Sequence, residues 1–333
     1  MNSYAIKAYN LTRIVNLIKV FASFQLSRLV SKPIHWGMPV SLSVEPTTAC
    51  NLGCSQCPSG IKAFSRSTGN LKPEMFTALM NQTSPWLTYI TFYFQGEPFI
   101  NKDVFKMIRQ ASNAHIFTAS STNGHFLNPK VCHQIITSGL NQLIVSIDGI
   151  TQDSYEKYRT GGDLATVLQG LKNLVQAKKE SNAKHLTIIW QMIAFKSNEQ
   201  EIEQAQLLAN EMGVDEFRIK TAQVYEQADM FDLIPEQEKY SRYVLKNGVW
   251  KLKNKFYNHC WRMWQGCVMT WDGKIVPCCF DKDAQHTVGQ INTSSFKSIW
   301  SGNSMHRFRQ SILSNRKEID ICSNCSEGSK VWA

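Results

Sequence analysis

Three cysteines at the spacing C-x3-C-x2-C, within residues 50–57, constrain this chain more than any other feature of its sequence. Thiolates this close together can converge on one small inorganic centre, and iron–sulfur clusters are held in this way. Three protein ligands would leave one iron of a four-iron cluster open. A closed structural zinc site would want a fourth ligand nearby, whereas the next cysteine, Cys132, is far away in the sequence. We therefore predict an iron–sulfur site, with zinc or unligated thiols as the alternatives.

The chain has 333 residues and 43% hydrophobic content, which is enough for one large core or for a main domain with an appendage. Ten cysteines could indicate a secreted disulfide scaffold, but most of them fall in two groups with metal-like spacing. We find no secretory signal and no apolar run long enough to span a bilayer. These features predict a protein of the reducing cytoplasm.

The formal net charge is +10, spread along the chain rather than gathered in blocks. Such a charge can favour an anionic substrate, a phosphate-bearing cofactor or an anionic surface, although a solvated basic surface explains it more simply. No nucleic-acid-binding motif accompanies the charge, so we infer no nucleic-acid partner.

Residues 1–38 form a separate N-terminal segment in this interpretation. Apolar residues recur through residues 4–30 among Arg13, Lys19 and Arg28, which predicts an amphipathic helix with a broad apolar side. A basic helix of this kind can rest on a membrane surface, but such helices more often dock on their own domain, and we expect docking here. Pro33 ends the helix.

From residue 40 the pattern alternates regularly between strand and helix. We predict strands over residues 40–44, 87–94, 116–120, 143–147, 186–193 and 217–221, and helices over residues 73–82, 102–113, 129–138, 164–179 and 199–212. This alternation calls for a parallel sheet with right-handed crossovers. A partial (β/α)6 barrel satisfies the pattern, and a doubly wound open sheet is the alternative. In both folds the chemistry lies at the carboxyl ends of the strands, where the cysteine loop also lies.

Three polar motifs follow predicted strands, and a fourth comes a few residues after the third motif. They read Gln-Gly-Glu-Pro at residues 95–98, Ser-Thr-Asn-Gly at 121–124, Ser-Ile-Asp-Gly at 146–149 and Tyr-Arg-Thr-Gly-Gly at 158–162. Each one alone could be an ordinary turn or a surface ion pair. A carboxylate at a strand end can also accept a hydrogen bond from an ammonium group, and a guanidinium suits a carboxylate geometrically. Gln191 and Lys220, at the ends of the fifth and sixth predicted strands, lie at the same rim.

A second group of cysteines lies near the end of the chain, after a looser region with a predicted helical stretch over residues 237–245. It comprises Cys260, Cys278, Cys322 and Cys325. The dipeptide Asp272-Gly273 between apolar segments predicts a hairpin, which Cys260 and Cys278 flank. Four thiolates gathered in this way form a closed site, and by spacing alone zinc is a serious rival to iron and sulfide. Cys267 could replace Cys260 as a ligand.

The motifs, taken in order, resemble the radical S-adenosylmethionine (radical SAM) superfamily with a C-terminal SPASM/twitch auxiliary domain, from about residue 40 to the end of the sequence. The resemblance implies a radical SAM core barrel over residues 39–225 and a linker with a twitch-like α+β extension over residues 226–333. It also implies a 4Fe–4S cluster on Cys50, Cys54 and Cys57, whose open iron is chelated by S-adenosylmethionine. An auxiliary 4Fe–4S cluster would be held by Cys260, Cys278, Cys322 and Cys325.

The resemblance implies seven further residues in binding S-adenosylmethionine, namely Gly96, Glu97, Ser121, Asn123, Ser146, Asp148 and Arg159. Glu97 would bind the amino group of the cofactor, and Gly96 would let the backbone approach it closely. The hydroxyl, amide and aspartate side chains would bind the methionyl carboxylate or the ribose, and Arg159 would bind the carboxylate. The sequence departs from the family pattern at Gln56, where an aromatic residue usually precedes the third cysteine, and at Gln95, where the family has glycine.

This resemblance implies a radical SAM oxidoreductase. In the family, S-adenosylmethionine is reductively cleaved to a 5′-deoxyadenosyl radical that takes a hydrogen atom from the substrate, and the auxiliary cluster would accept an electron. We expect dehydrogenation of a small molecule such as a sugar or cyclitol, with a peptide-modifying maturase as the alternative and a flavodoxin or ferredoxin as electron donor. The rival classes, a non-catalytic iron–sulfur electron-transfer protein and a zinc-binding interaction protein, would not need the polar residues at the strand ends. The sequence assigns no catalytic base.

Overall fold

The computed structural model describes residues 8–331, apart from the side chain of Gln227. The helix predicted over residues 4–30 therefore lies partly outside the described residues. Its described part is α2 (Leu11–Val30), which begins at Asn10, whose side chain accepts a hydrogen bond from the backbone N–H of Arg13. None of the described helices is long and apolar enough to cross a membrane.

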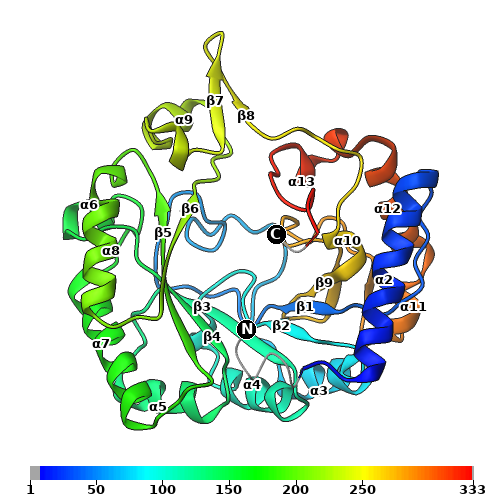
Figure 1. Cartoon of the computed structure of the whole chain (residues 1–333), viewed down its shortest axis with the longest axis horizontal. Coiled ribbons are helices and arrows are strands. Elements are labelled where there is room, and N and C mark those ends of the chain that lie inside the picture. Colours follow the sequence, from blue (N-terminus) through cyan, green and yellow to red (C-terminus); the bar gives the residue numbers. More distant parts are fainter. Residues whose placement is uncertain (1–7, 332–333) are drawn as a thin grey trace.

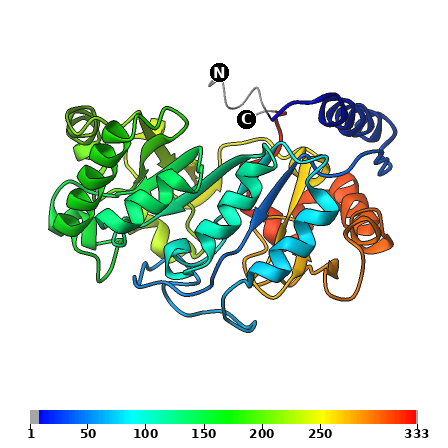
Figure 2. The ribbon, with the colours of Figure 1, turned by 90° about the horizontal axis from the view of Figure 1, so that it is seen from below.

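Six parallel strands form the centre of the molecule. They are β1 (Ser41–Val44), β2 (Tyr89–Thr91), β3 (Phe117–Thr122), β4 (Gln142–Ser146), β5 (Thr187–Ala194) and β6 (Glu216–Thr221). Strands that follow one another along the chain are also neighbours in the sheet. The sheet curves around a central space, and the helices cover its outer side (Figures 1 and 2). This arrangement confirms the predicted α/β fold built on a partial barrel of parallel strands.

The helices that follow these strands form the outer layer. They are α3 (Pro73–Thr83), α4 (Val104–Asn113), α5 (Pro129–Thr137), α6 (Gln152–Glu156), α7 (Leu164–Glu180) and α8 (Ile202–Glu211), with 3-10 turns at Pro98–Ile100 and Glu199–Glu201. Pro73 and Pro129 stand in the first turns of α3 and α5, where a helix needs no backbone N–H. The main core lies between this layer and the sheet and includes the fully buried Phe76, Phe92 and Trp190.

The C-terminal segment extends the same sheet beyond β1. Its elements are α10 (Arg262–Gln265), β9 (Gly266–Met269), β10 (Lys274–Val276), β11 (Gly289–Gln290), α11 (Phe296–Trp300), α12 (Asn303–Asn315), a 3-10 turn at Arg316–Glu318 and α13 (Asp320–Ser323). The hairpin predicted at Asp272-Gly273 is confirmed, and its first strand, β9, pairs in parallel with β1. A side chain at Gly266 would place its Cβ 2.2 Å from the carbonyl oxygen of Ser41, so only glycine permits this close pairing.

The linker between the two parts contains α9 (Gln227–Leu233) and a hairpin of β7 (Tyr243–Lys246) and β8 (Val249–Leu252). The helical stretch predicted over residues 237–245 is wrong, because this segment is a 3-10 turn at Glu238–Tyr240 followed by a strand. Asn247 and Gly248 have φ values of 52° and 76°. Positive φ at both central residues is typical of a two-residue hairpin turn, so this Asn-Gly pair determines the local structure.

Candidate active site

The three-cysteine loop follows β1 and is folded by its own backbone. The Cys57 N–H donates to the carbonyl of Cys54 (3.1 Å), and the Gly53 N–H donates to the carbonyl of Thr160 (2.9 Å). An added Cβ at Gly60 would lie 2.6 Å from the backbone nitrogen of Cys54, so the chain turns back tightly over this cysteine. The loop is therefore held at the carboxyl end of the strand, where the sequence predicts it.

The thiols of this loop act on one another electrostatically. The pKa of the Cys54 thiol is raised to about 11, mainly by burial; Arg159 lowers it, and Cys57 and Cys50 raise it. Three thiols that disfavour each other's charge fit an iron–sulfur cluster, whose irons supply the compensating positive charge. No three His, Cys, Asp or Glu side chains within residues 8–331 are grouped tightly enough to hold a single metal ion. A four-iron cluster is larger than one ion and holds its thiolates further apart.

Glu97 is almost completely buried, with 2% of its surface exposed. Its Oε2 accepts a hydrogen bond from the backbone N–H of Asn123 (2.7 Å), and its Oε1 accepts one from the hydroxyl of Thr122 (2.8 Å). Burial raises the pKa of Glu97 to about 7. Gly96 beside it has a φ of 72°, and an added Cβ would lie 2.4 Å from the carbonyl oxygen of Thr47. Glycine is therefore required where this turn crosses the chain that leads into the cysteine loop.

Asn123 connects the third motif to the cysteine loop. Its side-chain nitrogen donates to Oδ1 of Asn51 (2.8 Å) and lies 3.8 Å from the sulfur of Cys50. On the neighbouring strands β3 and β4, the hydroxyls of Ser121 and Ser146 are 3.4 Å apart. The structure thus brings the predicted Ser, Asn and Cys side chains together at one end of the sheet.

Asp148 and Arg159 form a buried ion pair, with Oδ2 of Asp148 2.6 Å from Nε of Arg159. The other carboxylate oxygen of Asp148 accepts from the backbone N–H of Ile193 (2.6 Å). Because the aspartate is fully buried and already bonded, it positions the guanidinium beside Cys54. A direct contact of Asp148 with a ribose hydroxyl stays a prediction.

Gln56, which stands where the family usually has an aromatic residue, contacts the linker. Its Nε2 donates to Oδ2 of Asp229 on α9 (3.0 Å). A second link was not apparent from the sequence: Arg66 donates two hydrogen bonds to the buried carboxylate of Glu45 (2.5 and 2.8 Å), which also accepts from the backbone N–H of Trp271 (3.1 Å). These contacts fix the cysteine loop to the linker and to the β9–β10 hairpin.

The second cysteine group assembles around a guanidinium. Burial lowers the pKa of Arg316, but the surrounding thiols of Cys260, Cys325 and Cys322 raise it above its usual value. Nη2 of Arg316 donates to the sulfur of Cys325 (3.3 Å), and so does the backbone N–H of Glu327 (3.3 Å). An added Cβ at residue 328, a glycine, would lie 2.3 Å from the Cys260 sulfur, so the chain end wraps closely around this thiol.

Cys278 belongs to the same group, because its thiol lies close enough to Cys260 to interact with it. The hydrogen bond with Cys279 raises the pKa of Cys278 most, followed by burial and by the charges of Cys279 and Cys260. Cys267 does not belong to it. Cys267 lies on β9 opposite Leu42, in the main core, and Arg309 is the charged residue that acts on it. The structure therefore places Cys260, rather than Cys267, with the other three predicted ligands. Three thiols around Arg316, with Cys278 beside Cys260, fit a closed iron–sulfur site.

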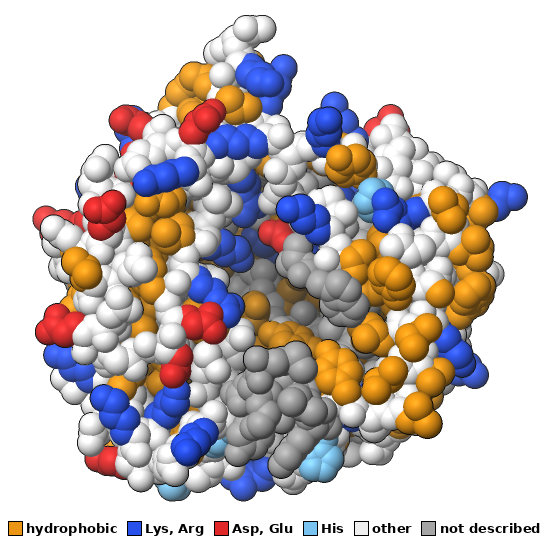
Figure 3. All heavy atoms as spheres, in the orientation of Figure 1, with side chains coloured by type: hydrophobic (Ala, Val, Ile, Leu, Met, Phe, Trp, Pro, Cys, Tyr) orange, Lys and Arg blue, Asp and Glu red, His pale blue; other side chains and the backbone are white. Residues whose placement is uncertain are grey.

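Basic side chains lie beside the second cysteine group. Burial raises the pKa of Tyr93, which follows β2, and Cys279, Arg262 and Arg218 act on it electrostatically. Burial also lowers the pKa of Lys220 on β6, whereas Glu327 raises it; Arg242, Cys279 and Arg262 act on it as well. Residues from β2, β6 and the C-terminal group therefore face one interior space. Figure 3 shows a hollow at the centre of this face, with Lys and Arg side chains on its wall.

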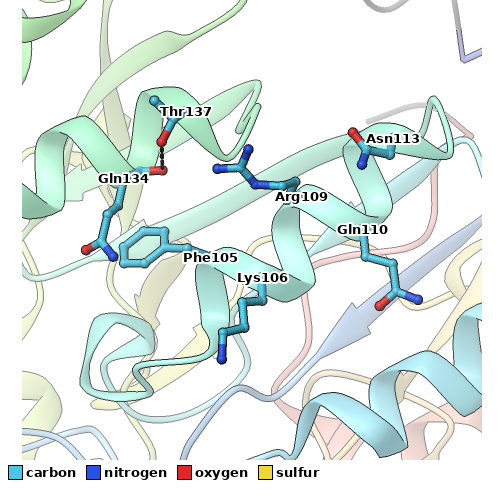
Figure 4. Close-up of a pocket in the computed structure, with 7 residues that line it drawn as sticks. All are labelled: Phe105, Lys106, Arg109, Gln110, Asn113, Gln134 and Thr137. Atoms are coloured by element: carbon cyan, nitrogen blue, oxygen red, sulfur yellow. Dashed lines mark hydrogen bonds between the residues drawn. The ribbon is translucent and has the colours of Figure 1, made fainter.

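A pocket on the outer surface, shown in Figure 4, is separate from this site. It lies between α4 and α5 and is lined by Phe105, Lys106, Arg109, Gln110, Asn113, Gln134 and Thr137. None of these residues belongs to a cysteine loop or to a strand end, so the pocket has no part in the candidate active site.

A parallel-strand barrel with a three-cysteine loop at its open end and a second cysteine group beside it defines an iron–sulfur enzyme. Residues 44–217, just over half of the 333 residues, match the radical SAM superfamily, and residues 260–326 match the SPASM iron–sulfur cluster-binding domain. The chain belongs to the radical SAM superfamily. Its cofactors are accordingly S-adenosylmethionine, a 4Fe–4S cluster and auxiliary iron–sulfur.

The sequence is similar to two kinds of curated protein. It is 28% identical over 139 residues to the mycofactocin maturase MftC of Mycobacterium ulcerans, a match that covers 42% of this chain and 37% of the relative. It is also 28% identical over 140 residues to the AdoMet-dependent heme synthase of Methanosarcina barkeri, covering 42% and 40%. The match spans less than half the length of both relatives.

Two solved structures share the fold. BtrN in complex with AdoMet and 2-DOIA is 18% identical, with a TM-score of 0.53 and coverage of 87% of this chain and 94% of that one. Streptococcus suis SuiB bound to its precursor peptide SuiA is 14% identical, with a TM-score of 0.63 and coverage of 94% and 74%. At these identities the likeness shows the fold alone.

Proposed function

We propose that this chain is a radical SAM oxidoreductase that dehydrogenates a small molecule bearing an anionic group, such as a sugar or cyclitol derivative. The observation that carries this proposal is the set of basic side chains beside the second cysteine group, together with the Lys and Arg side chains on the wall of the central hollow (Figure 3). A substrate held there would lie between the two positions at which iron–sulfur chemistry is expected.

Cys50, Cys54 and Cys57 would hold the first cluster, and Glu97, Asn123 and Arg159 would bind S-adenosylmethionine beside it. When bound, this pair of cofactors supplies a radical that takes a hydrogen atom from a substrate carbon. The auxiliary cluster would be held by Cys260, Cys278, Cys322 and Cys325. Transfer of one further electron from the substrate to that cluster, and of one proton to solvent, would complete a two-electron oxidation.

Lys220 gives the strongest indication of an anionic substrate. In the part of the chain that the structure describes, it forms no ion pair within 4.0 Å, whereas Arg218 is paired with Glu216 and Arg262 with Glu327. Lys220 is exposed on the edge strand β6, where Glu327 acts on it electrostatically, and the negative charge of a ligand can neutralise it further. A phosphate or carboxylate on the substrate would do so.

The test is anaerobic reconstitution with iron and sulfide, reduction, and assay of 5′-deoxyadenosine together with substrate panels of phosphorylated, carboxylated and neutral sugars and cyclitols, and of peptides. We expect an anionic small molecule to increase 5′-deoxyadenosine formation and to yield a product lacking two hydrogens. Failure to form 5′-deoxyadenosine under any condition would contradict the proposal. Turnover of peptides alone would favour the maturase alternative.

The variant Lys220→Gln separates substrate binding from cofactor chemistry. We expect KM for the anionic substrate to rise about 10- to 100-fold, which is the usual effect of losing a hydrogen bond to a charged group. Cleavage of S-adenosylmethionine without substrate should stay unchanged. Lys172→Gln, at an exposed lysine on α7, is the matched control and should alter neither quantity.

A further inference from the structure

The N-terminal helix α2 packs on the protein mainly through polar residues and exposes much of its apolar side. Its buried positions include the polar residues Arg13, Asn16, Ser23 and Ser27. Several of its largest apolar side chains are turned outward, with Leu11 77%, Ile18 60% and Leu29 82% exposed. The helix therefore docks on its own domain, as the sequence predicts, but it does so through a largely polar side.

Hydrogen bonds fix this orientation. The guanidinium of Arg13 donates to four backbone carbonyls, those of Ala8 (3.1 Å), Ser84 (2.9 Å), Ala114 (2.8 Å) and His115 (2.7 Å). Asn16 both donates to and accepts from the backbone of Met38 (2.9 and 2.8 Å). Rolling α2 to bury its apolar side would leave these groups without their present partners, at a cost of about 1–3 kcal/mol for each group that stays buried.

The outward residues form a stripe along one side of the helix, with Leu29 about three turns beyond Ile18. Leu11, Ile14, Val15, Ile18 and Leu29 are separated by three, four or multiples of about 3.6 residues, so they share one side of the helix, opposite the buried residues. The same geometry puts Lys19 on one border of the stripe and Arg28 on the other. Figure 1 shows α2 along the edge of the molecule, and Figure 3 shows hydrophobic side chains gathered along that edge.

The surface beside the stripe is also aromatic and basic. A groove along α2 is lined by Leu11 and Val15 together with Trp36 and Trp86, and Lys297 is among its other lining residues. Trp36 is 56% exposed. Tryptophans beside an apolar surface, with long basic side chains at its borders, are typical of protein segments that lie at the membrane–water interface.

The net positive charge of the N-terminal segment indicates what kind of partner this surface would bind. No Asp or Glu precedes Glu45 in the sequence, whereas Lys19, Arg28 and Lys32 are exposed basic residues in that stretch. Two copies of this surface would bring like charges together, which disfavours a symmetric dimer through α2. An anionic lipid surface would complement both the apolar stripe and the basic borders.

We propose that the outer side of α2 docks on an anionic membrane surface as an interfacial helix. Leu11, Ile14, Val15, Ile18 and Leu29 enter the boundary between headgroups and acyl chains, while Lys19 and Arg28 reach the lipid phosphates. The contact is peripheral, because none of the described helices can span a bilayer. The proposal is independent of the reaction that the candidate active site performs.

Vesicle flotation of the full chain tests this directly, with vesicles of phosphatidylcholine alone and of phosphatidylcholine mixed with phosphatidylglycerol. We expect binding to the anionic vesicles and at least about 10-fold less binding to the neutral ones, decreasing as salt is added. The double variant Ile18→Glu/Leu29→Glu should lower binding about 10-fold or more while keeping the melting temperature and the cleavage of S-adenosylmethionine.

Leu207→Glu is the matched control, since Leu207 is 69% exposed on α8, and it should leave vesicle binding unchanged. Absence of wild-type binding to the anionic vesicles would overturn the proposal, as would equal binding by wild type and the double variant. A concentration-dependent dimer that Ile18→Glu/Leu29→Glu disrupts, without vesicle binding by the wild type, would assign the stripe to a second copy instead.

Discussion

The two cysteine groups differ in what the protein supplies around the sulfurs. At the N-terminal group the neighbouring cation is Arg159, whose guanidinium is already paired with Asp148 at 2.6 Å. The side chain within reach of the Cys50 sulfur is the neutral amide of Asn123. At the C-terminal group the thiols surround Arg316, which donates directly to a cysteine sulfur.

This difference matches two kinds of iron–sulfur site. Net charge and hydrogen bonds to the sulfurs tune the reduction potential of a cluster. A site with four thiols and its own guanidinium is complete within the protein and suits an electron carrier. The other site has three thiols, with a neutral amide and a buried carboxylate nearby. A ligand must therefore fill one coordination position there and supply part of the compensating positive charge.

Removing one cysteine from each group should give the largest effect and should distinguish the two groups. Cys54→Ala should lower bound iron from about eight to about four atoms per chain and reduce cleavage of S-adenosylmethionine more than about 100-fold, since even changes behind the ligands cost 10- to 100-fold. Cys322→Ala should remove a similar amount of iron but abolish only substrate oxidation. Iron and sulfide analysis with 5′-deoxyadenosine quantification measures both. Equal loss of cleavage in the two variants would remove the distinction drawn between the groups.

Binding of S-adenosylmethionine at the N-terminal site should depend on Glu97. Glu97→Gln should weaken binding of S-adenosylmethionine by about 10- to 100-fold, because a hydrogen bond between charged groups is replaced by a weaker one. The pKa of Glu97 is raised to about 7 by burial, so wild-type affinity should fall as pH decreases below about 7 and the carboxylate is neutralised. Equilibrium binding measured across pH should show this dependence in the wild type and not in the variant.

The same raised pKa has the opposite effect on the stability of the protein without ligand. Between the ordinary carboxyl pKa of 4.5 and about 7, the folded protein keeps a proton that the unfolded chain releases. The free energy of unfolding should therefore decrease as pH rises through this window. Denaturant unfolding of wild type and Glu97→Gln would show whether the carboxyl is the cause, since the variant should lack this component.

The third prediction concerns the guanidinium of the C-terminal group. Arg316→Gln removes a positive charge that stabilises the reduced cluster, so the reduction potential of the auxiliary cluster should fall by tens of millivolts, where about 59 mV corresponds to a tenfold change for one electron. The N-terminal cluster in the same molecule is the internal reference and should not shift. A common shift of both potentials would mean that the guanidinium acts through the fold rather than on its own cysteine group.

Much of this arrangement could be predicted from the sequence because it is local. The strand and helix alternation, the first turns at Pro73 and Pro129, and the turn at Asp272-Gly273 each depend on a few neighbouring residues. The Asn247-Gly248 turn is equally local. An Asn-Gly pair is a stronger signal than the weak helical periodicity around it, so the β7–β8 hairpin was also predictable.

Contacts between distant segments could not be predicted in this way. The pairing of β9 with β1, the bond from Asn123 to Glu97 and the polar docking of α2 through Arg13 join residues far apart in the chain. The polar docking also runs against the usual rule, because four backbone carbonyls compensate a buried guanidinium that hydrophobicity alone would place outside.

The choice between Cys260 and Cys267 as a ligand also depends on contacts between distant segments. Substituting Cys267 should have the smallest effect of the variants considered. Both precede the Asp272-Gly273 turn in the sequence, but only Cys260 faces the C-terminal thiols, while Cys267 packs in the main core on β9. Cys267→Ala should therefore retain both clusters and lower the free energy of unfolding by about 1–2 kcal/mol, because it leaves a small cavity in the core. Iron content and denaturant unfolding measure the two parts. Loss of about four irons in Cys267→Ala, with none lost in Cys260→Ala, would reverse the assignment and make the C-terminal group open on the side of β9.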